Sequence, residues 1–266
     1  MDPCWKPDRT FRLAAWNVNS LRARMPRVEE WLAYASPDVL CMQETKVTDA
    51  AFPAMAFSAL GYESVYHGGA GRWNGVAILS RVGLEDVTAG FDDDPEAENR
   101  SIAATCAGVR VCSVYVPNGR EVGTEHYQAK LAWLDQLAAY LAATSDPSGE
   151  VAVCGDFNVA PEDRDVYDPK KFVGATHVSP EERAALGRVL DWGLEDAFRL
   201  CRSESELFTW WDYRAGDFHQ HRGMRIDLLL VTRKLAERAV MAVIDRNARK
   251  GKLPSDHAPV FVDFQR

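Results

Sequence analysis

Short runs of apolar and β-branched residues recur along the whole chain. The eight clearest runs span residues 11–17, 39–42, 76–79, 101–106, 109–116, 151–154, 226–231 and 260–264. Runs of this kind are typical of β-strands that cross a buried core. The pattern therefore predicts a β-rich protein.

Between these runs, two segments show the pattern of α-helices. The clearer segment, residues 125–143, presents an apolar face made of Leu131, Leu134, Leu137, Ala138 and Leu141. The second helix is predicted to begin at Ser179. Ser179 would cap it, Pro180 would be its first residue, and Glu182 would be the reciprocal partner in a capping box.

The connections between the strands decide the predicted architecture. Some neighbouring runs are joined only by turn-like residues, as at 106–109, whereas others flank a helix. Strict alternation of strand and helix, which would give a parallel sheet, is absent. We therefore expect an α/β fold of two packed mixed β-sheets flanked by helices, and we expect residues 1–266 to form a single domain without an internal repeat.

Composition limits how such a protein can bind other molecules. The chain has 31 basic and 39 acidic residues and a formal net charge of −8. This balance argues against surface-wide attraction to nucleic acid, so any DNA contact must be local. Carboxylates that gather metal ions, with Arg and Lys on one face, would provide that contact.

Cysteine usage and hydropathy indicate where the protein resides. The six cysteines show no Cys-x-x-Cys spacing, and three of them lie inside apolar runs. We therefore expect reduced cysteines and a cytoplasmic protein. The first residues lack the order of a signal peptide, and no apolar run reaches membrane-spanning length, so the chain is predicted to be soluble.

The strongest candidate for chemistry follows the run at 151–154, where Asp156 and Asn158 end a predicted strand. Their spacing places both side chains on one side of the strand. A carboxylate and a carboxamide there can position a water molecule, stabilise a phosphate or bind a hard cation. The alternative is an ordinary Asx turn.

A second candidate is the Asp256-His257 pair just before the last strand. Histidine can act as a base or contact a phosphate, and a nearby carboxylate would orient its ring and favour its charged form. Asp227, a lone carboxylate in an apolar strand, is the predicted partner. The alternatives are a surface histidine and an ion pair between Asp227 and Arg225.

Other polar residues also follow apolar runs. They are Asn17 and Asn19, Glu44, and Tyr115 with Asn118. Each taken alone fits turn chemistry, a strand end that reaches water, or packing. Together, polar side chains at so many strand ends favour one metal–phosphate site. Its oxygen ligands suit Mg²⁺, and the histidines and cysteines lack zinc-ligand spacing.

These segments resemble one known family over nearly the whole chain. In order they are Trp16-Asn-Val-Asn-Ser-Leu-Arg-Ala-Arg24, Gln43-Glu-Thr-Lys46, Tyr115-Val-Pro-Asn-Gly119, Gly155-Asp-Phe-Asn-Val-Ala-Pro161, Arg225-Ile-Asp227 and Ser255-Asp-His257. The set resembles the exonuclease III family of DNA-repair nucleases, within the endonuclease/exonuclease/phosphatase superfamily. The resemblance implies a four-layer α/β sandwich. It also implies a Mg²⁺-dependent 3′-to-5′ exodeoxyribonuclease of base-excision repair that trims 3′ ends and leaves a 3′-hydroxyl and a 5′-phosphate, with Mn²⁺ as the alternative ion.

The resemblance also implies a role for each position. Metal ligands would be Asn17, Glu44, Asp156, Asn158 and Asp256, with Glu44 the principal one. Asp156 would activate or position the attacking water, and Asn158 and Tyr115 would contact the scissile phosphate. His257, oriented by Asp227, would stabilise the negative charge that develops on the phosphate. The DNA contacts would be Asn19, Asn118, His177, Trp210, Met224 and Ile226.

Within that DNA set, the family's pocket for a flipped-out abasic sugar would be walled by Trp210, Met224 and Ile226. Trp210 and Trp211 also fit core aromatics, which is the interpretation we favour for Trp211. Met224 also fits a wedge that enters the DNA.

Two positions depart from the family pattern. Asn19 stands where some relatives carry Asp, which would weaken a second cation site. His177 and Val178 replace a small residue followed by an aromatic one. If His177 faces the pocket, its imidazole would obstruct an abasic sugar, and incision at abasic sites would be weak while 3′-end activities remain. The alternative is that His177 points to solvent or to a phosphate.

The predicted partner is double-stranded DNA with abasic sites or 3′ ends, bound by a monomer that needs no obligate protein partner and no membrane. The alternative function is a superfamily phosphatase or phospholipase acting on inositol phosphates or sphingomyelin. Segments such as Leu21-Arg-Ala-Arg24 favour the DNA-repair branch instead. A nucleic-acid-binding module without catalytic activity is disfavoured, because the set of polar residues at the strand ends is complete.

Overall fold

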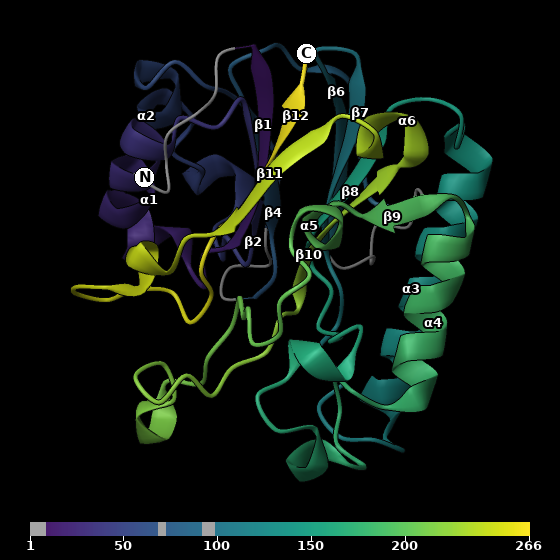
Figure 1. Cartoon of the computed structure of the whole chain (residues 1–266). Coiled ribbons are helices and arrows are strands. Elements are labelled where there is room, and N and C mark those ends of the chain that lie inside the picture. The colour runs from purple at the N-terminus through teal and green to yellow at the C-terminus, as the bar shows by residue number, and fades with distance from the viewer. Residues whose placement is uncertain (1–8, 69–72, 92–98) are drawn as a thin grey trace.

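The computed structural model describes residues 9–68, 73–91 and 99–266, and it contains two six-stranded sheets packed face to face (Figure 1). Cys4 and the N-terminal segment considered for a signal peptide lie outside the described residues. In strand order, the first sheet contains β11 (Ala239–Ile244), β12 (Val260–Gln265), β1 (Thr10–Asn17), β2 (Val39–Gln43), β4 (Val76–Ser80) and β3 (Glu63–His67). The second contains β5 (Glu85–Ala89), β6 (Ser101–Cys106), β7 (Val109–Tyr115), β8 (Val151–Asp156), β10 (Asp227–Thr232) and β9 (Leu194–Asp196).

Helices cover the outer face of each sheet, which gives four layers (Figure 1). α1 (Leu21–Ala35) and α2 (Ala54–Ala59) flank the first sheet, and α3 (Glu125–Thr144) and α4 (Pro180–Asp191) flank the second. The shorter elements are α5 (Ala197–Cys201), α6 (Arg233–Ala236) and the 3₁₀ turns η1 (Asp49–Ala51), η2 (Asp163–Asp165), η3 (Pro169–Phe172), η4 (Arg214–Gly216) and η5 (Arg246–Arg249). The predicted four-layer α/β sandwich is confirmed.

The core follows from the alternation of side chains along the strands. In β1 and β2, Leu13 and Cys41 face the other sheet, whereas Trp16 and Leu40 pack under α1. Both faces of these strands are therefore buried, which explains why they read as continuous apolar runs rather than as alternating ones. The sheets are mixed, as predicted: β1–β2 and β7–β8 are parallel pairs and the other pairs are antiparallel.

All eight predicted strands are present, and four more were not predicted. In the described part of the chain these are β3, β5, β9 and β11, which are partly or largely exposed edge strands. β3, β5 and β9 lack a continuous apolar run, whereas the apolar run of β11, residues 239–244, was not predicted as a strand. α1 was also missed, because Pro26 lies inside it and proline normally ends a helix. α3 and α4 begin where predicted, and the capping box of Ser179 and Glu182 is formed.

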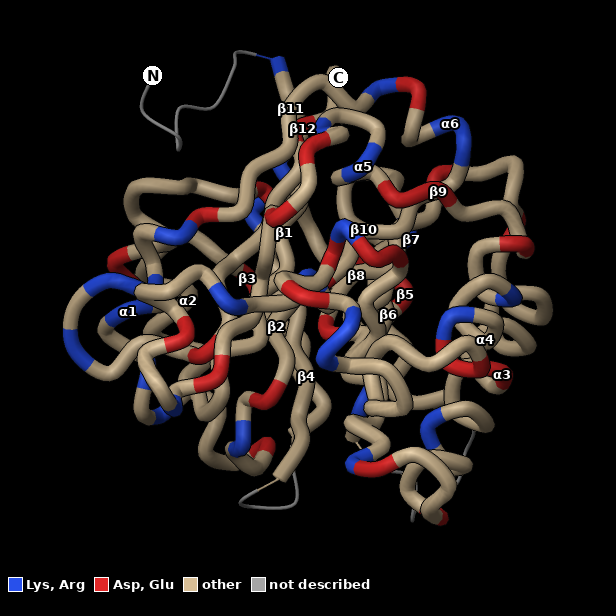
Figure 2. The backbone as a smooth tube through the Cα atoms, turned by 60° about the horizontal axis from the view of Figure 1, so that its bottom comes forward, with Lys and Arg blue, Asp and Glu red and all other residues tan. Residues whose placement is uncertain are grey.

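The directions of the strands bring distant segments to one edge of the sandwich. β1, β2, β7 and β8 end there, while β4, β10 and β12 begin there. The connections from β8 to α4 and from α5 to β10 extend beyond this edge, which faces the viewer more directly in Figure 2. Every strand end that carries a candidate polar residue therefore lies at the same edge.

Two further observations concern the described part of the chain. No helix there combines the length and the apolar character needed to cross a lipid bilayer. Its five cysteines, Cys41, Cys106, Cys112, Cys154 and Cys201, are free thiols.

Candidate active site

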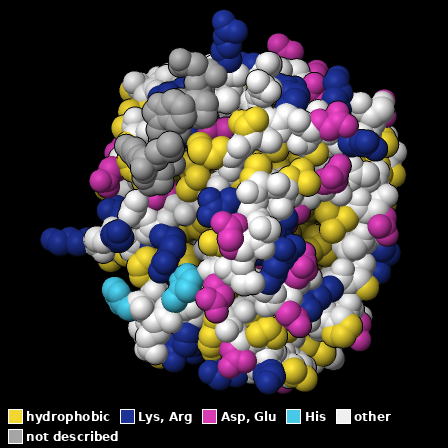
Figure 3. Space-filling view, viewed as in Figure 1, with side chains coloured by type: hydrophobic (Ala, Val, Ile, Leu, Met, Phe, Trp, Pro, Cys, Tyr) yellow, Lys and Arg dark blue, Asp and Glu magenta, His cyan; other side chains and the backbone are white. Residues whose placement is uncertain are grey.

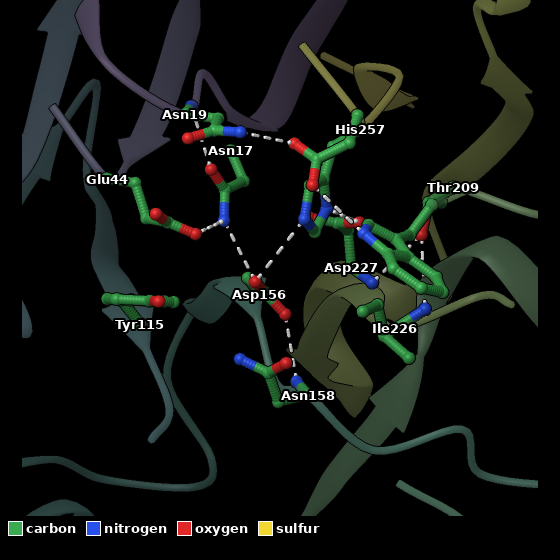
Figure 4. A network of polar contacts seen from close by, with 12 residues as sticks. Asn17, Asn19, Glu44, Tyr115, Asp156, Asn158, Thr209, Ile226, Asp227 and His257 are labelled. Carbon is green, nitrogen blue, oxygen red and sulfur yellow. Dashed lines mark hydrogen bonds and ion pairs between the residues drawn. The ribbon is translucent and has the colours of Figure 1, made fainter. Parts of the chain in front are cut away.

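Asp156, the last residue of β8, lies at the centre of the polar network (Figure 4). Its side chain is buried, with 1% of the residue exposed. Oδ2 accepts a hydrogen bond of 2.9 Å from Nδ2 of Asn17 and lies 3.7 Å from Nε2 of His257. The preceding Gly155 allows the close approach of β7, because a Cβ atom there would lie 2.0 Å from the carbonyl oxygen of Val114.

Asn158 follows in a left-handed conformation, with φ 51°. Its backbone N–H donates to Oδ1 of Asp156 at 2.9 Å, so the Asx turn considered as an alternative is present. The turn does not exclude a role in the site, since the other oxygen of Asp156 bonds across the two sheets to Asn17. The Asn158 amide accepts from Asn118 at 3.2 Å and donates to the carbonyl of Val116 at 3.0 Å, which fixes its orientation.

His257 and Asp227 form a buried pair beside Asp156 (Figure 4). Nδ1 of His257 lies 2.8 Å from Oδ2 of Asp227, and Asp227 is directly opposite Asp156 in the β8–β10 ladder. The predicted partnership is confirmed in the geometry. The alternative partner was wrong, because the guanidinium of Arg225 bonds to Asp165 and pairs with Asp196.

The charges of this cluster follow from burial and proximity. Burial by itself would lower the pKa of His257, but the carboxylates of Asp227 and Asp156 outweigh it and raise the pKa to about 10. Burial raises the pKa of Asp156 to about 7, despite the opposing effect of His257. Near neutral pH, the imidazole is therefore a cation beside a carboxyl group that is poised to gain or lose a proton.

Glu44, which follows β2, faces Asp156 across the gap between the sheets. Nδ2 of Asn17 donates to Glu44 Oε1 at 2.8 Å, and Nζ of Lys46 lies 2.8 Å from Oε2. Ligand atoms of Glu44, Asp156 and His257 all lie within 4.8 Å of one another. Because His257 carries a proton on each ring nitrogen when charged, the two carboxylates with the oxygen of an amide are the better donor set for a hard cation.

Tyr115 ends β7 and completes this side of the site. Burial and the carboxylates of Glu44 and Asp156 raise the pKa of its phenol well above the usual range. The guanidinium of Arg100 lies 4.7 Å from the ring centre. Tyr115 therefore remains a neutral hydrogen-bond donor at any physiological pH.

Asp256 lies at the edge of the site, and both of its carboxylate oxygens accept hydrogen bonds. Oδ1 accepts from Nδ2 of Asn19 at 2.9 Å, and Oδ2 accepts from Nε1 of Trp210 at 3.1 Å. Among the described residues, it is not part of the close group formed by Glu44, Asp156 and His257. Asn19 also accepts from Nζ of Lys46 at 2.7 Å, so Asn19 links the Glu44 side of the site to Asp256.

A small apolar cluster adjoins these polar residues. Val166, Met224 and Ile226 are buried in it, and Phe172, Val178 and Trp210 are partly buried against them. Met224 is only 2% exposed, so its side chain packs inside this cluster and does not project from the surface as a wedge would. Trp211 is fully buried in a separate cluster, as expected for a core residue.

His177 lies beside Asn158. Its Nδ1 atom contacts the carbonyl oxygen of Asn158, and its neighbour Val178 packs against the apolar cluster. Burial and the nearby Lys130 ammonium lower the pKa of His177 to about 4, so the ring is neutral. The backbone has φ 76°, a conformation that favours glycine.

Lys130 is a functional candidate that the sequence interpretation missed. Its buried ammonium donates to the carbonyl oxygens of Asn118 at 3.2 Å and Asn158 at 2.6 Å, and it pairs with the buried carboxylate of Glu182. Lys130 therefore ties both amide-bearing loops to α3 and α4. The sequence feature that could have identified Lys130 is its position: it is a charged residue on the buried face of α3, which it shares with Tyr127, Leu134, Leu137 and Leu141.

Thr209 was also missed, and it holds the start of β10. Its Oγ1 atom accepts from the backbone N–H groups of Ile226 and Asp227, both at 3.1 Å. These bonds fix the residue that orients His257. No local pattern in the sequence marks Thr209, because its partners lie in another segment.

The distribution of charged side chains on the surface agrees with the composition of the chain. On the face seen in Figure 3, acidic and basic side chains are interspersed, and neither sign forms a continuous field. Attraction for a polyanion must therefore be local, as expected from the net charge of −8.

Comparisons with known proteins agree with this geometry. Residues 14–257 match the model of the Endonuclease/Exonuclease/phosphatase family. The chain is 37% identical to exodeoxyribonuclease III of Haemophilus influenzae, over 96% of this chain and all of that protein. An AP endonuclease from Archaeoglobus fulgidus has a TM-score of 0.93 and 40% identity, covering 96% and 100% of the two chains. A 3′ phosphatase of Neisseria (NExo), solved with a product DNA hairpin, has a TM-score of 0.91 and 38% identity with the same coverage.

Proposed function

The chain belongs to the endonuclease/exonuclease/phosphatase family, and from this membership and its site we propose that it is a metal-dependent hydrolase of DNA phosphodiesters that acts at 3′ ends. The observation that carries the proposal is the arrangement around Asp156. A buried carboxyl group with a pKa of about 7 lies between an amide, a second carboxylate and a charged imidazole. Such a set can activate water and stabilise the negative charge of a phosphate.

The donor chemistry fits a hard divalent cation. Glu44 would be the principal ligand, with Asn17, Asp156, Asn158 and Asp256 as the further proposed ligands. We propose Mg²⁺, with Mn²⁺ as the alternative, since all of these groups offer oxygen. When bound, the ion would act as a Lewis acid on a phosphoryl oxygen. Asp256 is the least favourably placed of the set, because among the described residues it lies outside the close group of Glu44, Asp156 and His257.

The residues of the chain then have separate roles. Asp156, held by Asn17, accepts a proton from the water that attacks phosphorus. Asn158 and the neutral phenol of Tyr115 donate hydrogen bonds to the phosphate. The His257 cation, fixed by Asp227, stabilises the charge that develops on it. The bond from phosphorus to the 3′ oxygen breaks, and that oxygen takes up a proton from solvent water, which leaves a 3′-hydroxyl and a 5′-phosphate.

We propose that the apolar cluster of Trp210, Met224 and Ile226 contacts the sugar next to the scissile phosphate, while Asn19 and Asn118 contact the DNA backbone. We propose that His177 narrows the approach to this cluster, so that incision at abasic sites is weak and 3′-to-5′ exonuclease and 3′-end trimming remain. The support is its contact with Asn158 and the packing of Val178 against the cluster.

We also propose one catalytic domain over residues 1–266 that acts as a monomer in the cytoplasm on double-stranded DNA. The free thiols of the five described cysteines fit a reducing compartment. The alternative of an inositol-phosphate or sphingomyelin hydrolase is not favoured, because the relatives that match over the full length are named for DNA chemistry.

A substrate panel tests the proposal. It contains duplex DNA with a recessed 3′ end, an internal abasic site, a 3′-phosphate, an RNA/DNA hybrid and a soluble inositol phosphate, each with Mg²⁺, Mn²⁺ or chelator. We expect release of 5′-mononucleotides from the recessed end in the presence of metal. Release of phosphate from the inositol phosphate alone would contradict the proposal.

A further inference from the structure

A cavity lies between two surface loops, residues 212–219 and residues 249–254. Its volume is about 330 Å³, within the range of pockets that hold small ligands. Arg249 lines this cavity, although only 6% of the residue is exposed. The cavity therefore contains a cation that is largely removed from water, which is costly unless a partner compensates for the charge.

One edge of the Arg249 guanidinium has no partner. Nη1 donates to the carbonyl oxygen of Ser255, but Nε is buried without a hydrogen bond, and neither Nε nor Nη2 bonds to any of the described residues. Arg225 uses the same edge to bind the carboxylate of Asp165, with hydrogen bonds of 2.7 Å from Nε and 3.1 Å from Nη2. An oxyanion in the cavity would supply the acceptor that this edge of Arg249 lacks.

The carboxylates of the cavity do not neutralise this charge. Two of them line it, and each is paired at 2.5 Å with an arginine of its own loop: Asp212 with Arg214, and Asp217 with Arg222. Lys250 also lines the cavity, is exposed, and forms no ion pair within the described ranges. Arg249 and Lys250 therefore give the cavity an excess of positive charge, in a protein whose net charge is −8.

Aromatic rings form the apolar side of the cavity. The guanidinium of Arg249 lies 4.8 Å from the ring centre of Phe218 and 5.5 Å from that of Tyr213. These cation–π contacts offset part of the cost of burying the charge, but they leave its hydrogen bonds unmade. Tyr213 is 51% exposed, so part of its ring can stack on a flat ligand. Positive charge beside such a ring matches a ligand that carries both a phosphate and an aromatic base.

We propose that this cavity binds a free nucleoside 5′-monophosphate, with the phosphate on Arg249 and Lys250 and the base against Tyr213. A terminal phosphate can reach a deeply buried cation, whereas a phosphate within a duplex is flanked by a sugar on each side. The inference rests on the proposed function only for the source of the ligand, because 5′-mononucleotides are the product of that reaction. Arg249 also holds the carbonyl group of Ser255, in the segment that leads to His257, so the cavity adjoins the reaction centre but is separate from it.

Isothermal titration calorimetry of the full chain in the presence of chelator tests the proposal, with 5′-dAMP, deoxyadenosine and inorganic phosphate as ligands. We expect a Kd below about 1 mM for 5′-dAMP and at least about tenfold weaker binding of the other two. Arg249→Met removes the guanidinium and should weaken 5′-dAMP binding by about tenfold or more. Lys250→Ala alters an exposed side chain, so the fold should be retained, and it should weaken binding about threefold.

The matched controls are Arg233→Met and Lys234→Ala, which alter exposed side chains on α6 and should leave the Kd unchanged. Asp156→Asn should bind 5′-dAMP as the wild type does, because the reaction centre is not the site. Loss of binding in Asp156→Asn would place the ligand in the reaction centre and overturn the inference. No binding of 5′-dAMP, equal binding of inorganic phosphate, or an unchanged Kd in Lys250→Ala and folded Arg249→Met would also overturn it.

A further arm separates a free nucleotide from a DNA end. Two duplexes that differ only in a 5′-phosphate should bind with equal Kd values. Tighter binding of the phosphorylated duplex that Arg249→Met abolishes would assign the cavity to a DNA end and contradict the inference. Because calorimetry requires no cleavage, a protein that binds 5′-dAMP in this way but hydrolyses no DNA would contradict the proposed function alone.

Discussion

The imidazole of His257 and the carboxylate of Asp227 are joined by a buried contact of 2.8 Å between Nδ1 and Oδ2. Asp227 lies at the start of β10, and His257 immediately precedes β12, in the other sheet. The pair therefore joins the two sheets at the edge where the reaction centre lies. It also sets the charge of the imidazole, whose pKa is raised to about 10.

The first prediction concerns this charge. Because His257 must be protonated to stabilise a phosphate, kcat/KM should fall as the pH rises toward about 10. Asp227→Asn removes the carboxylate that most raises the pKa of His257, so burial then dominates and the alkaline limb should move down by about one pH unit or more. The pH profile of kcat/KM on recessed-end DNA measures the shift.

The control for this profile is Asp135→Asn, which removes a half-exposed carboxylate on α3 that pairs with Arg188. Its profile should match that of the wild type. An unshifted alkaline limb in Asp227→Asn, with the fold intact by circular dichroism, would show that Asp227 does not set the charge of His257.

The second prediction concerns access of an abasic sugar to the apolar cluster beside His177. His177→Gly removes an imidazole beside Asn158 at a backbone position that glycine favours, so the fold should be retained. We expect incision at an internal abasic site to rise about 10- to 100-fold, the range over which a pocket discriminates by small steric differences. Activity on a recessed 3′ end serves as the internal control and should change little. Unchanged incision would show that the His177 side chain does not obstruct the binding of an abasic sugar.

The third prediction separates stability from positioning at Lys130. Lys130→Met leaves the buried Glu182 carboxylate unpaired and should cost about 3–5 kcal/mol of unfolding free energy. Adding Glu182→Gln should restore much of that stability, because glutamine removes the charge and can keep the capping-box bond to Ser179. It should not restore kcat, because the carbonyl oxygens of Asn118 and Asn158 still lack their shared donor.

Urea unfolding and steady-state kinetics on the single and double variants measure the two effects separately. We expect kcat of the double variant to stay about tenfold below that of the wild type, since small displacements of catalytic groups are costly. If kcat recovers along with stability, Lys130 has only a structural role.

The fourth prediction concerns the metal. Glu44→Gln should raise the Mg²⁺ concentration for half-maximal cleavage by at least about tenfold, because it removes a charged oxygen ligand. Calorimetric titration of the DNA-free protein with Mg²⁺ should show the same weakening. Glu63→Gln, at an exposed carboxylate on β3, is the matched control. Equal Mg²⁺ affinity in Glu44→Gln and wild type would place the ion elsewhere.

The strands that carry the site were predictable because they are buried on both faces. Such strands contain unbroken apolar runs, and a polar residue at the end of each run stands out, as Asp156 and Glu44 do. Edge strands such as β5, with every residue exposed, leave no comparable signal. The helix α1 was not predicted for a different reason. Pro26 lies inside it, and there tertiary packing overrides the local rule that proline ends a helix.

Partnerships between distant residues were only partly predictable. Asp227 and His257 were paired because a lone buried carboxylate needs a donor, but that rule did not choose between His257 and Arg225. Arg225 pairs instead with the buried carboxylate of Asp165 and the partly buried carboxylate of Asp196, and neither is close to it in sequence. Lys130 and Thr209 act through backbone groups, which every residue possesses, so the sequence does not identify their partners.

The most direct test of the central proposal is Mg²⁺-dependent cleavage of recessed-end duplex DNA by Asp156→Asn, with Asp163→Asn, a mainly exposed carboxylate, as control. Asparagine preserves the size of the side chain, and its single oxygen can accept from Asn17 or from the N–H of Asn158, but it cannot accept the proton from water. We predict that kcat falls by about 10²- to 10⁴-fold while DNA binding and folding are retained. Cleavage at the wild-type rate by folded Asp156→Asn protein would contradict the assignment of Asp156 as the centre of the reaction.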